Sequence, residues 1–334
     1  MRILYVAMAS DYGDATRGQS YEHTNFHSAL CGMGHEVVHF DFMEREANVG
    51  RRRMQQELVT VATTCRPDLS FFVLYQNQIS PRTIGRVAEA TGAPTMNWFA
   101  DDHWRFDNFS RHYAPALNWV VTTDQDAVTR YEALGHSGVI LSQWACNRYA
   151  YTRVDDELRH DVTFVGQPHG TRRAVIEALQ GADIDVECWG RGWPGGRIEH
   201  DAMVEIFSTS RINLNLSNSS TAPVGLRHRL GATLRRTRVN RGPRPSQIKG
   251  RTFEVPGCGG FLLTDRAPHL ERYFDLQREV AVYDDPRELP EQIAYWISHE
   301  AERAAVADAG YARVLREHTY DHRFAVIFEQ AGLL

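Results

Sequence analysis

The chain has 334 residues, 43% of them hydrophobic and 10% aromatic, which is enough to bury two cores and excludes a disordered protein. Its formal net charge of −5 gives no overall indication of binding to nucleic acid or to an anionic membrane.

Short apolar runs alternate with amphipathic segments along the first half of the chain. The expected strands cover residues 3–7, 36–42, 69–74, 95–99, 119–122 and 139–141. The expected helices cover residues 21–32, 51–64, 81–91 and 125–134. Nearly continuous hydrophobic strands joined by helices predict a parallel sheet with helices on both faces.

The same alternation begins again after a polar segment at 147–159 that has no hydrophobic period. Strands are expected at residues 161–165, 184–189, 212–216, 261–264 and 279–283. Helices are expected at residues 171–179, 203–209, 288–298, 300–317 and 320–331. The chain therefore reads as two Rossmann-like, doubly wound α/β domains in tandem. Two such domains facing each other form a central cleft at the carboxyl ends of their strands, so the loops that follow strands are the first places to look for chemistry.

The loop after the first strand, residues 8–20, is long and polar. Its glycines, Gly13 and Gly18, do not have the spacing of a dinucleotide fingerprint, which disfavours NAD binding. The loop either lines a substrate cleft or is an ordinary connection, with His23 near the start of the following helix.

The loop "NWFADDHWRFD" places Asp101, Asp102 and His103 directly after an apolar strand. Neighbouring carboxylates raise each other's pKa, which suits a general base. A metal-binding D-x-D motif is excluded, because the two aspartates are contiguous and residue 103 is histidine. The alternative is that one aspartate only caps a turn. We expect a catalytic base among Asp101, Asp102, His103 and His23, and no metal site.

Two loops in the second half are candidates for binding the phosphates and the nucleobase of a nucleotide. In "FVGQPHGTRRAV", Gly166 permits close backbone approach and Arg172 lies in the first turn of a helix. A cation opposes the helix dipole there unless an anion is bound, although a solvated surface arginine is the alternative. In "ECWGRGWPGG", Trp189 and Gly190 either wall a flat ring such as a nucleobase or close the edge of a domain.

The segment from Arg211 to Arg251 contains ten cationic residues, and no Asp or Glu occurs between Ile206 and Phe253. Arginine favours planar recognition of phosphate groups over lysine, so an anionic acceptor is one interpretation and a solvated face is the other. The residues expected to contact an acceptor or phosphates are Arg227, Arg229, Arg235, Arg236 and Arg238.

The stretch "RTFEVPGCGGFLLTD", residues 251–265, resembles a signature of the spore-maturation CgeB-like glycosyltransferases, which have the GT-B fold. The resemblance continues in order through most of the chain. The other matching blocks are "NWFADD", "VTFVGQPHGTRRAVIEAL", "SRINLNLS", "EVAVYDDPRELPEQIAYWI" and "REHTYDHRF".

The resemblance implies transfer of a sugar from a nucleotide-sugar donor held mainly by the second domain. Many GT-B enzymes have a Glu, followed five residues later by Gly, that bonds the donor ribose; Glu254 and Gly259 match this pattern. Retaining relatives carry another Glu eight residues earlier, where this chain has Ser246, which leaves the stereochemical outcome open. Lys249 and Arg251 would then face the diphosphate.

The donor-binding residues expected from these loops and from the resemblance are Gly166, Arg172, Trp189, Gly190, Lys249, Arg251, Glu254, Gly259 and Gly260. Fixed cations and a helix N-terminus can stabilise a leaving nucleoside diphosphate without a metal. We therefore expect a metal-independent hexosyl- or pentosyltransferase that needs no cofactor besides its nucleoside diphosphate sugar, which we expect to be a UDP-sugar.

The expected organisation is an acceptor-side domain at 1–147, a nucleotide-sugar-binding domain at 148–317, and a C-terminal helix at 318–334 that packs back on the first domain. The sequence leaves four classes of acceptor possible: a glycan, a protein, a small molecule or DNA. Two other interpretations are possible: glycosylation of nucleic-acid bases through the arginine-rich segment 227–251, and a non-catalytic protein that binds nucleotide sugars.

No apolar stretch has the length of a membrane span. The scattered cysteines fit neither a zinc site nor disulfides, and we expect a cytoplasmic location.

Overall fold

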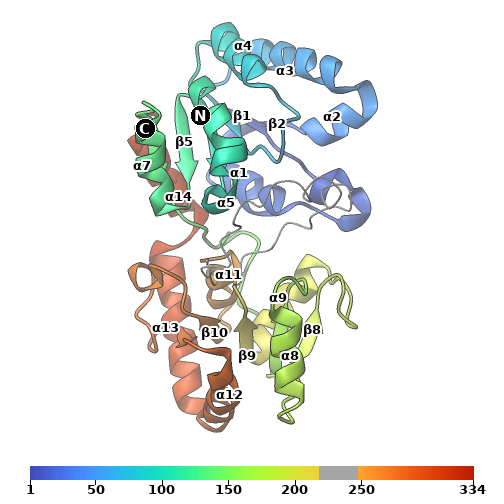
Figure 1. Ribbon diagram of the computed structural model, residues 1–334, viewed down its shortest axis with the longest axis vertical. Helices are drawn as coiled ribbons and strands as arrows, with labels where there is room; N and C mark the ends of the chain where they lie inside the picture. Colours follow the sequence, from blue (N-terminus) through green and yellow to red (C-terminus); the bar gives the residue numbers. More distant parts are fainter. Residues whose placement is uncertain (218–246) are drawn as a thin grey trace, which may run out of the picture. The chain divides into compact units, whose positions relative to one another are not determined.

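The structure is a computed structural model that describes residues 1–217 and 247–334 (Figure 1). The chain divides into two compact units. Unit 1 comprises Met1–Tyr151 and Glu317–Leu334, and unit 2 comprises Thr152–Arg316. Each unit is built around one parallel β-sheet, which confirms the predicted fold class of two Rossmann-like α/β domains.

Unit 1 contains a six-stranded parallel sheet in the order β2-β1-β3-β4-β5-β6. Its strands are β1 (Arg2–Val6), β2 (Glu36–Phe40), β3 (Leu69–Phe72), β4 (Thr95–Phe99), β5 (Trp119–Thr122) and β6 (Val139–Leu141). The strand order reverses between β1 and β3, so the chain leaves these two neighbouring strands toward opposite faces of the sheet. Ligands of open α/β sheets bind at such a switch point, beyond the carboxyl ends of the strands.

Helices cover both faces of the unit 1 sheet. The helices are α1 (Ser28–Gly32), α2 (Phe42–Val49), α3 (Arg51–Cys65), α4 (Pro81–Thr91), α5 (Asp102–Arg105), α6 (Arg111–Tyr113), α7 (Gln125–Ala133) and α14 (Tyr320–Gln330). Leu4 and Val6 pack against α3, α4 and α7, whereas the alternate residues Ile3 and Tyr5 pack against α1 and α14. Figure 1 shows the red C-terminal helix α14 within unit 1. The sheet is thus buried on both faces, as its hydrophobic strands predict.

Short helical turns occupy several connections of both units. They are the 3₁₀ helices η1 (Asp11–Gly13), η2 (Ala15–Arg17), η5 (Ala114–Ala116), η7 (Leu270–Arg272) and η8 (Pro286–Glu288), and the π-helices η3 (His23–His27) and η4 (Phe106–Ser110). The helix expected at 21–32 therefore begins with a π-turn. The strand expected at 36–42 ends at Phe40, because the Asp41 carboxylate accepts bonds from the N–H groups of Met43 and Glu44 and caps α2.

Three histidines of unit 1 share one partly buried cluster. The rings of His23 and His27, one turn apart on η3, stack with centroids 4.5 Å apart, and the His39 ring of β2 lies 5.3 Å from His23 and 5.2 Å from His27. Burial, together with the neighbouring rings of His23 and His39, lowers the pKa of His27 to about 4. His27 is therefore packed as a neutral imidazole at neutral pH.

Unit 2 contains a five-stranded parallel sheet in the order β11-β10-β9-β7-β8. Its elements are β7 (His160–Val165), α8 (Arg172–Gln180), β8 (Glu187–Trp189), α9 (His200–Thr209), β9 (Ser210–Asn215), α11 (Arg251–Gly257), β10 (Leu262–Asp265), β11 (Ala281–Tyr283), α12 (Leu289–Ser298) and α13 (Glu300–Glu317). The strand order reverses between β7 and β9, which is the switch point of this sheet. α8, α12 and α13 share a core with one face of the sheet.

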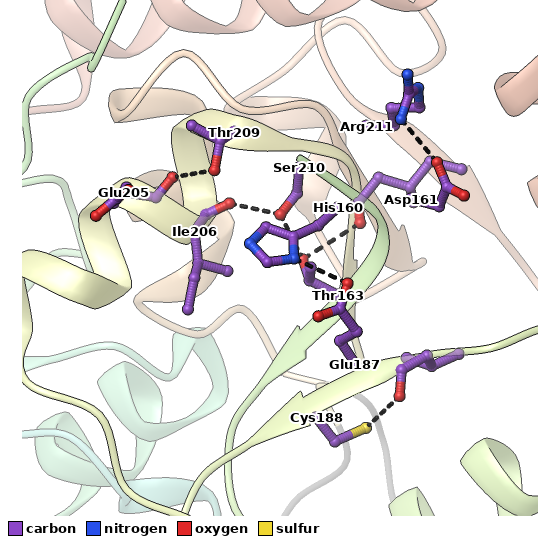
Figure 2. A network of polar contacts seen from close by, with 12 residues as sticks. His160, Asp161, Thr163, Glu187, Cys188, Glu205, Ile206, Thr209, Ser210 and Arg211 are labelled. Carbon is purple, nitrogen blue, oxygen red and sulfur yellow. Dashed lines mark hydrogen bonds and ion pairs between the residues drawn. The ribbon is translucent and has the colours of Figure 1, made fainter. Parts of the chain in front are cut away.

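Polar contacts help to join the strands and α9 near the start of β7 (Figure 2). The Thr163 hydroxyl donates to Ser210 Oγ at 3.0 Å, and Ser210 Oγ donates to the Ile206 carbonyl in the last turns of α9. His160 Nδ1 lies 2.8 Å from Glu187 Oε1 on the neighbouring strand β8. These side chains hold the amino-terminal part of the sheet, which is the end opposite the switch-point loops.

Gly260 lies where α9, β9 and the approach to β10 pack most closely. A Cβ atom at this position would lie 2.2 Å from the Phe207 carbonyl oxygen and 2.8 Å from Asn213 Nδ2. Asn213 Nδ2 also donates to that same carbonyl at 3.0 Å, so the oxygen has little freedom to move. Only glycine fits here without displacing backbone.

We expect Gly260→Ala to lower the free energy of unfolding of unit 2 by about 1–3 kcal/mol, because the added methyl group overpacks a backbone carbonyl. Urea titration followed by tryptophan fluorescence measures the change. Gly181→Ala is the matched control in the same unit, since its Cβ would meet the nearest carbonyl oxygens at an ordinary 3.5 Å. Equal stability of the two variants would contradict this packing.

The depressed pKa of His27 makes unit 1 sensitive to acid. The unfolded chain binds a proton at His27 below a pH of about 6.5, whereas the folded chain binds it only near pH 4. Stability should therefore fall as the pH decreases from about 6.5 to 4, and His27→Gln should make this slope shallower. The control His112→Gln, at an exposed position, should leave the slope unchanged in urea titrations at pH 7.5, 6 and 5.

Candidate functional site

Arg172 joins the two loops at the switch point of unit 2. It is the first residue of α8, and its Nε donates to the Leu216 carbonyl after β9 at 2.8 Å. Its Nη1 donates to the Gln167 carbonyl in the loop after β7 at 3.0 Å. The neighbouring Arg173 points elsewhere and donates to the Gly192 carbonyl at 2.9 Å. Of the two arginines in the first turn, Arg172 is thus the one at the switch point.

Positive charge accumulates around Arg172. Burial lowers the pKa of Arg172, and the nearby guanidinium of Arg251 lowers it further, whereas Asp265 and Tyr283 act in the opposite direction. Two guanidinium groups close enough to disfavour each other's charge are stabilised when an anion binds between or beside them. Arg172 makes its two carbonyl bonds with Nε and Nη1, so it retains N–H donors for a ligand.

Arg251 and Glu254 form an ion pair within the first turn of α11. Arg251 Nη1 bonds Glu254 Oε2, and Arg251 Nε donates to the carbonyl of Val165 at the end of β7 at 3.3 Å. The Glu254 side chain is fully buried, and its Oε1 has no hydrogen-bond partner among the described residues. A buried carboxylate oxygen without a donor is costly, which suggests a ligand hydroxyl as its partner.

Lys249 lies in the turn before α11 and not on the helix with Arg251 and Glu254. Its Nζ donates to Gln247 Oε1 at 2.7 Å. The helix begins at Arg251, after the carbonyl of Lys249 accepts a turn bond from the N–H of Thr252. The predicted contact of Lys249 with a diphosphate stays a prediction.

Asp265 and Ser217 form a second polar feature at this edge of the sheet, which the sequence did not single out. Asp265 ends β10, and its carboxylate accepts bonds from the Ser217 N–H at 2.9 Å and the Ser217 hydroxyl at 2.7 Å. Both residues are buried. A Ser two residues after one strand and an Asp at the end of another give no local signal, because only the parallel pairing of β9 and β10 brings them together.

The predicted glycines Gly166 and Gly190 lie against each other. Gly190 has a φ of +132°, and a Cβ there would lie 2.3 Å from the Gly166 carbonyl oxygen. Trp193 Nε1 donates to that same oxygen at 2.8 Å, whereas the Trp189 ring lies edge-on to His160 with centroids 5.4 Å apart. Close packing of the loops after β7 and β8 therefore explains both glycines, and Trp193 is the tryptophan beside Gly166.

Gly259 and Gly260 lie at the opposite end of α11 from Arg251. Gly259 has a φ of +74°, and its Cβ would meet the Arg153 side chain at 2.8 Å. Both glycines therefore have packing roles away from the ion pair. Their predicted part in donor binding stays a prediction.

The four predicted bases of unit 1 have different surroundings. Asp102 is fully buried, and its Oδ2 accepts a bond from the Tyr131 hydroxyl at 2.9 Å. Burial raises the pKa of Asp102, while the hydroxyls of Ser110, Thr122 and Tyr131 act against this shift. Asp102 thus bonds the core of unit 1 through Oδ2, while its Oδ1 has no hydrogen-bond partner among the described residues, and its role as a base stays a prediction.

His23 belongs to the histidine cluster, and burial lowers its pKa, with His39 lowering it further. His103 lies edge-on to the exposed ring of Trp104, with centroids 6.4 Å apart. Asp101 is partly exposed and is the one of the four predicted bases that lines the pocket at the carboxyl ends of β3 and β4. The structure therefore separates the four residues, and Asp101 has the setting expected of a base.

The five arginines predicted to contact an acceptor, together with Ser246, lie outside the described residues. They are Arg227, Arg229, Arg235, Arg236 and Arg238. Among residues 1–217 and 247–334, no group of three or more His, Cys, Asp or Glu side chains is placed to hold a metal ion. Within the same part of the chain, none of the helices has both the length and the apolar character needed to cross a bilayer.

Comparison with known proteins gives matches in sequence and in structure. Residues 171–329 match a family model described as glycosyl transferase-like. The spore protein CgeB of Bacillus subtilis (strain 168) is 19% identical over 236 residues, which is 68% of this chain and 72% of that protein. The matched region of the family model contains Arg172, Arg251, Glu254 and Asp265.

Solved structures that are similar over the whole chain have the same two-domain fold. Anabaena HepE in complex with UDP-glucose has a TM-score of 0.64 at 12% identity, with all of both chains covered. Sucrose-phosphate synthase from Thermosynechococcus elongatus has a TM-score of 0.63 at 10% identity, with 100% of this chain and 98% of that chain covered. These similarities agree with the resemblance found in the sequence: the chain has the GT-B fold, is similar to the spore protein CgeB, and contains a glycosyl transferase-like region at residues 171–329.

Proposed function

We propose that the chain transfers a hexosyl or pentosyl group from a UDP-sugar to a hydroxyl-bearing acceptor, with unit 2 binding the donor and unit 1 the acceptor. The observation that carries the proposal is the buried Glu254 carboxylate, whose Oε1 has no partner among the described residues, beside the Arg251 and Arg172 guanidinium groups. HepE, which has the same fold, was solved with UDP-glucose.

The charges at this site match the parts of a nucleoside diphosphate. Arg172 and Arg251 would bind the phosphate oxygens, because guanidinium groups donate paired N–H bonds to phosphate. Glu254 Oε1 would accept a bond from a ribose hydroxyl, the role that the CgeB-like resemblance implies for it. Lys249 and Gly166 lie on neighbouring loops and Trp189 ends β8, and all three are weaker candidates for donor contact.

The same guanidinium groups would also stabilise the leaving diphosphate during the transfer reaction. As the bond between the sugar and the diphosphate breaks, negative charge grows on the leaving phosphate oxygen. Fixed guanidinium groups stabilise this charge in the transition state, with no reorganisation at the moment of reaction. We therefore propose that the leaving group is stabilised by protein cations, without a required metal ion. Among the four predicted bases, Asp101 is the one that lines the pocket of unit 1.

Calorimetric titration with UDP and with uridine tests the donor site. Arg251→Ala should weaken UDP binding by about 10–100-fold, the effect of losing a hydrogen bond to a charged group. Glu254→Gln should weaken UDP and uridine by similar factors, because both ligands carry the ribose. The double variant Arg251→Ala/Glu254→Gln removes both members of the buried ion pair and should bind UDP no better than either single variant.

Arg287→Ala is the matched control, because this arginine of unit 2 is 90% exposed and should not affect binding. The melting temperature of each variant separates loss of binding from loss of fold. Unchanged UDP affinity in folded Arg251→Ala and Glu254→Gln would refute this donor site. A wild-type protein that binds none of UDP, GDP and dTDP would refute the proposed function.

A further inference from the structure

A pocket of about 70 Å³ lies at the switch point of unit 1. It is formed by residues directly after β3 and β4, together with Glu22 from the segment that follows β1. The side chains of this pocket that carry charge are Glu22, Asp101 and Arg105. Of these, Glu22 was not among the residues predicted to act, because it lies in the first turn of the expected helix 21–32 with no motif around it.

The two carboxylates of the pocket are not equivalent. Asp101 lies near Arg105 and favours the charged form of that guanidinium, whose Nη1 donates to the Tyr75 carbonyl at 2.6 Å. Asp101 therefore has a cationic neighbour in the pocket. Burial raises the pKa of Glu22, and the carboxylates of Asp11 and Asp101 raise it further, while its own backbone N–H and the Ser20 hydroxyl act in the opposite direction. Glu22 therefore holds a proton more readily than an ordinary, solvent-exposed glutamate side chain.

The rest of the lining suits one alcohol group on a larger molecule. Tyr75, Phe99 and Phe109 are the aromatic side chains among the residues that line the pocket besides Trp98, and Ser110 also lies in its lining. A volume of about 70 Å³ admits a hydroxymethyl or a ring hydroxyl with its carbon, but not a whole sugar. Aromatic walls with a few convergent polar groups are typical of small-molecule sites.

We propose that Glu22 is the general base of the transfer reaction and that this pocket holds the reacting hydroxyl of a sugar or another alcohol. This inference rests on the proposed function. The acceptor O–H proton passes to the Glu22 carboxylate as the acceptor oxygen forms its bond to the anomeric carbon. The bond from that carbon to UDP breaks, and its electron pair leaves on the phosphate oxygen. Glu22 then releases the proton to water, and the anomeric configuration is inverted.

Two variants and one proton-free nucleophile test the inference. The substrates are UDP-glucose, UDP-galactose and UDP-N-acetylglucosamine with a panel of sugars and alcohols, and UDP release is measured. Glu22→Gln should lower kcat by about 10²–10⁴-fold, the usual contribution of a general base, with UDP affinity unchanged. Azide, which has no proton to lose, should restore turnover in Glu22→Gln and give a glycosyl azide of inverted configuration. Glu22→Ala is the second variant, should the amide disturb the fold.

The pH profile separates catalysis from packing. In the wild type, kcat/KM should fall on the acid side as Glu22 takes up a proton, and this limb should be absent from the azide reaction of Glu22→Gln. The control Glu44→Gln, at an exposed position in unit 1, should keep the wild-type profile.

Each remaining outcome overturns the inference in a distinguishable way. Full activity of Glu22→Gln in an active wild-type background refutes the role of Glu22 and leaves the transferase proposal intact. Loss of activity that azide does not restore assigns Glu22 a structural role and also refutes it. A wild-type protein that neither binds UDP nor consumes any of the three donors refutes the proposed function. The role of Glu22 as general base is then refuted as well.

Discussion

The parallel pairing of every strand is the constraint on which the two sites depend. In a parallel sheet each connection must return across a face, so all carboxyl ends lie at one edge and the loops after them converge there. In both sheets the strand order reverses once, between β1 and β3 and between β7 and β9. At that reversal the two connections leave toward opposite faces, and the space between them is open to a ligand. Arg172 bonds the loops on both sides of the reversal in unit 2, and Glu22 and Tyr75 meet beside the reversal in unit 1.

The charged side chains at this edge of the unit 2 sheet contribute little to the stability of the unit. A buried ion pair repays its desolvation only with good geometry and with further bonds to its remaining atoms. Arg251 and Glu254 satisfy one carboxylate oxygen, while Oε1 lacks a partner among the described residues. The nearby Arg172 adds a second guanidinium, whose charge Arg251 disfavours. Conflicts of this kind between packing and charge are expected at functional sites, because the ligand supplies the missing partner.

The sequence predicted the fold because the signals for it are local. Hydrophobic runs such as Thr95–Phe99 and Trp119–Thr122 and the helical periods between them give the parallel sheets directly. Arg251 and Glu254 could be paired from their spacing of three on one helix. The contact of Ser217 with Asp265 and the burial of Asp102 could not, since they depend on the register of strands and on side chains distant in sequence. The sequence can single out loops with charged residues after strands, but only tertiary packing decides which of these charges lines a pocket.

The two switch points have the same backbone geometry and opposite electrostatics. In unit 2, guanidinium groups accumulate where a leaving diphosphate would become more negative. In unit 1, carboxylates accumulate, and Asp11 and Asp101 both favour the protonated form of Glu22. Glycosyl transfer needs these two opposite fields, because one reactant loses a proton while the other gains negative charge. A protein that only bound a nucleotide sugar would need the cations of unit 2 but would gain nothing from a carboxylate held at raised pKa in unit 1. The position of Glu22 in a pocket at the switch point of unit 1, together with the direction of its pKa shift, is therefore what favours the proposed catalyst over a binding protein.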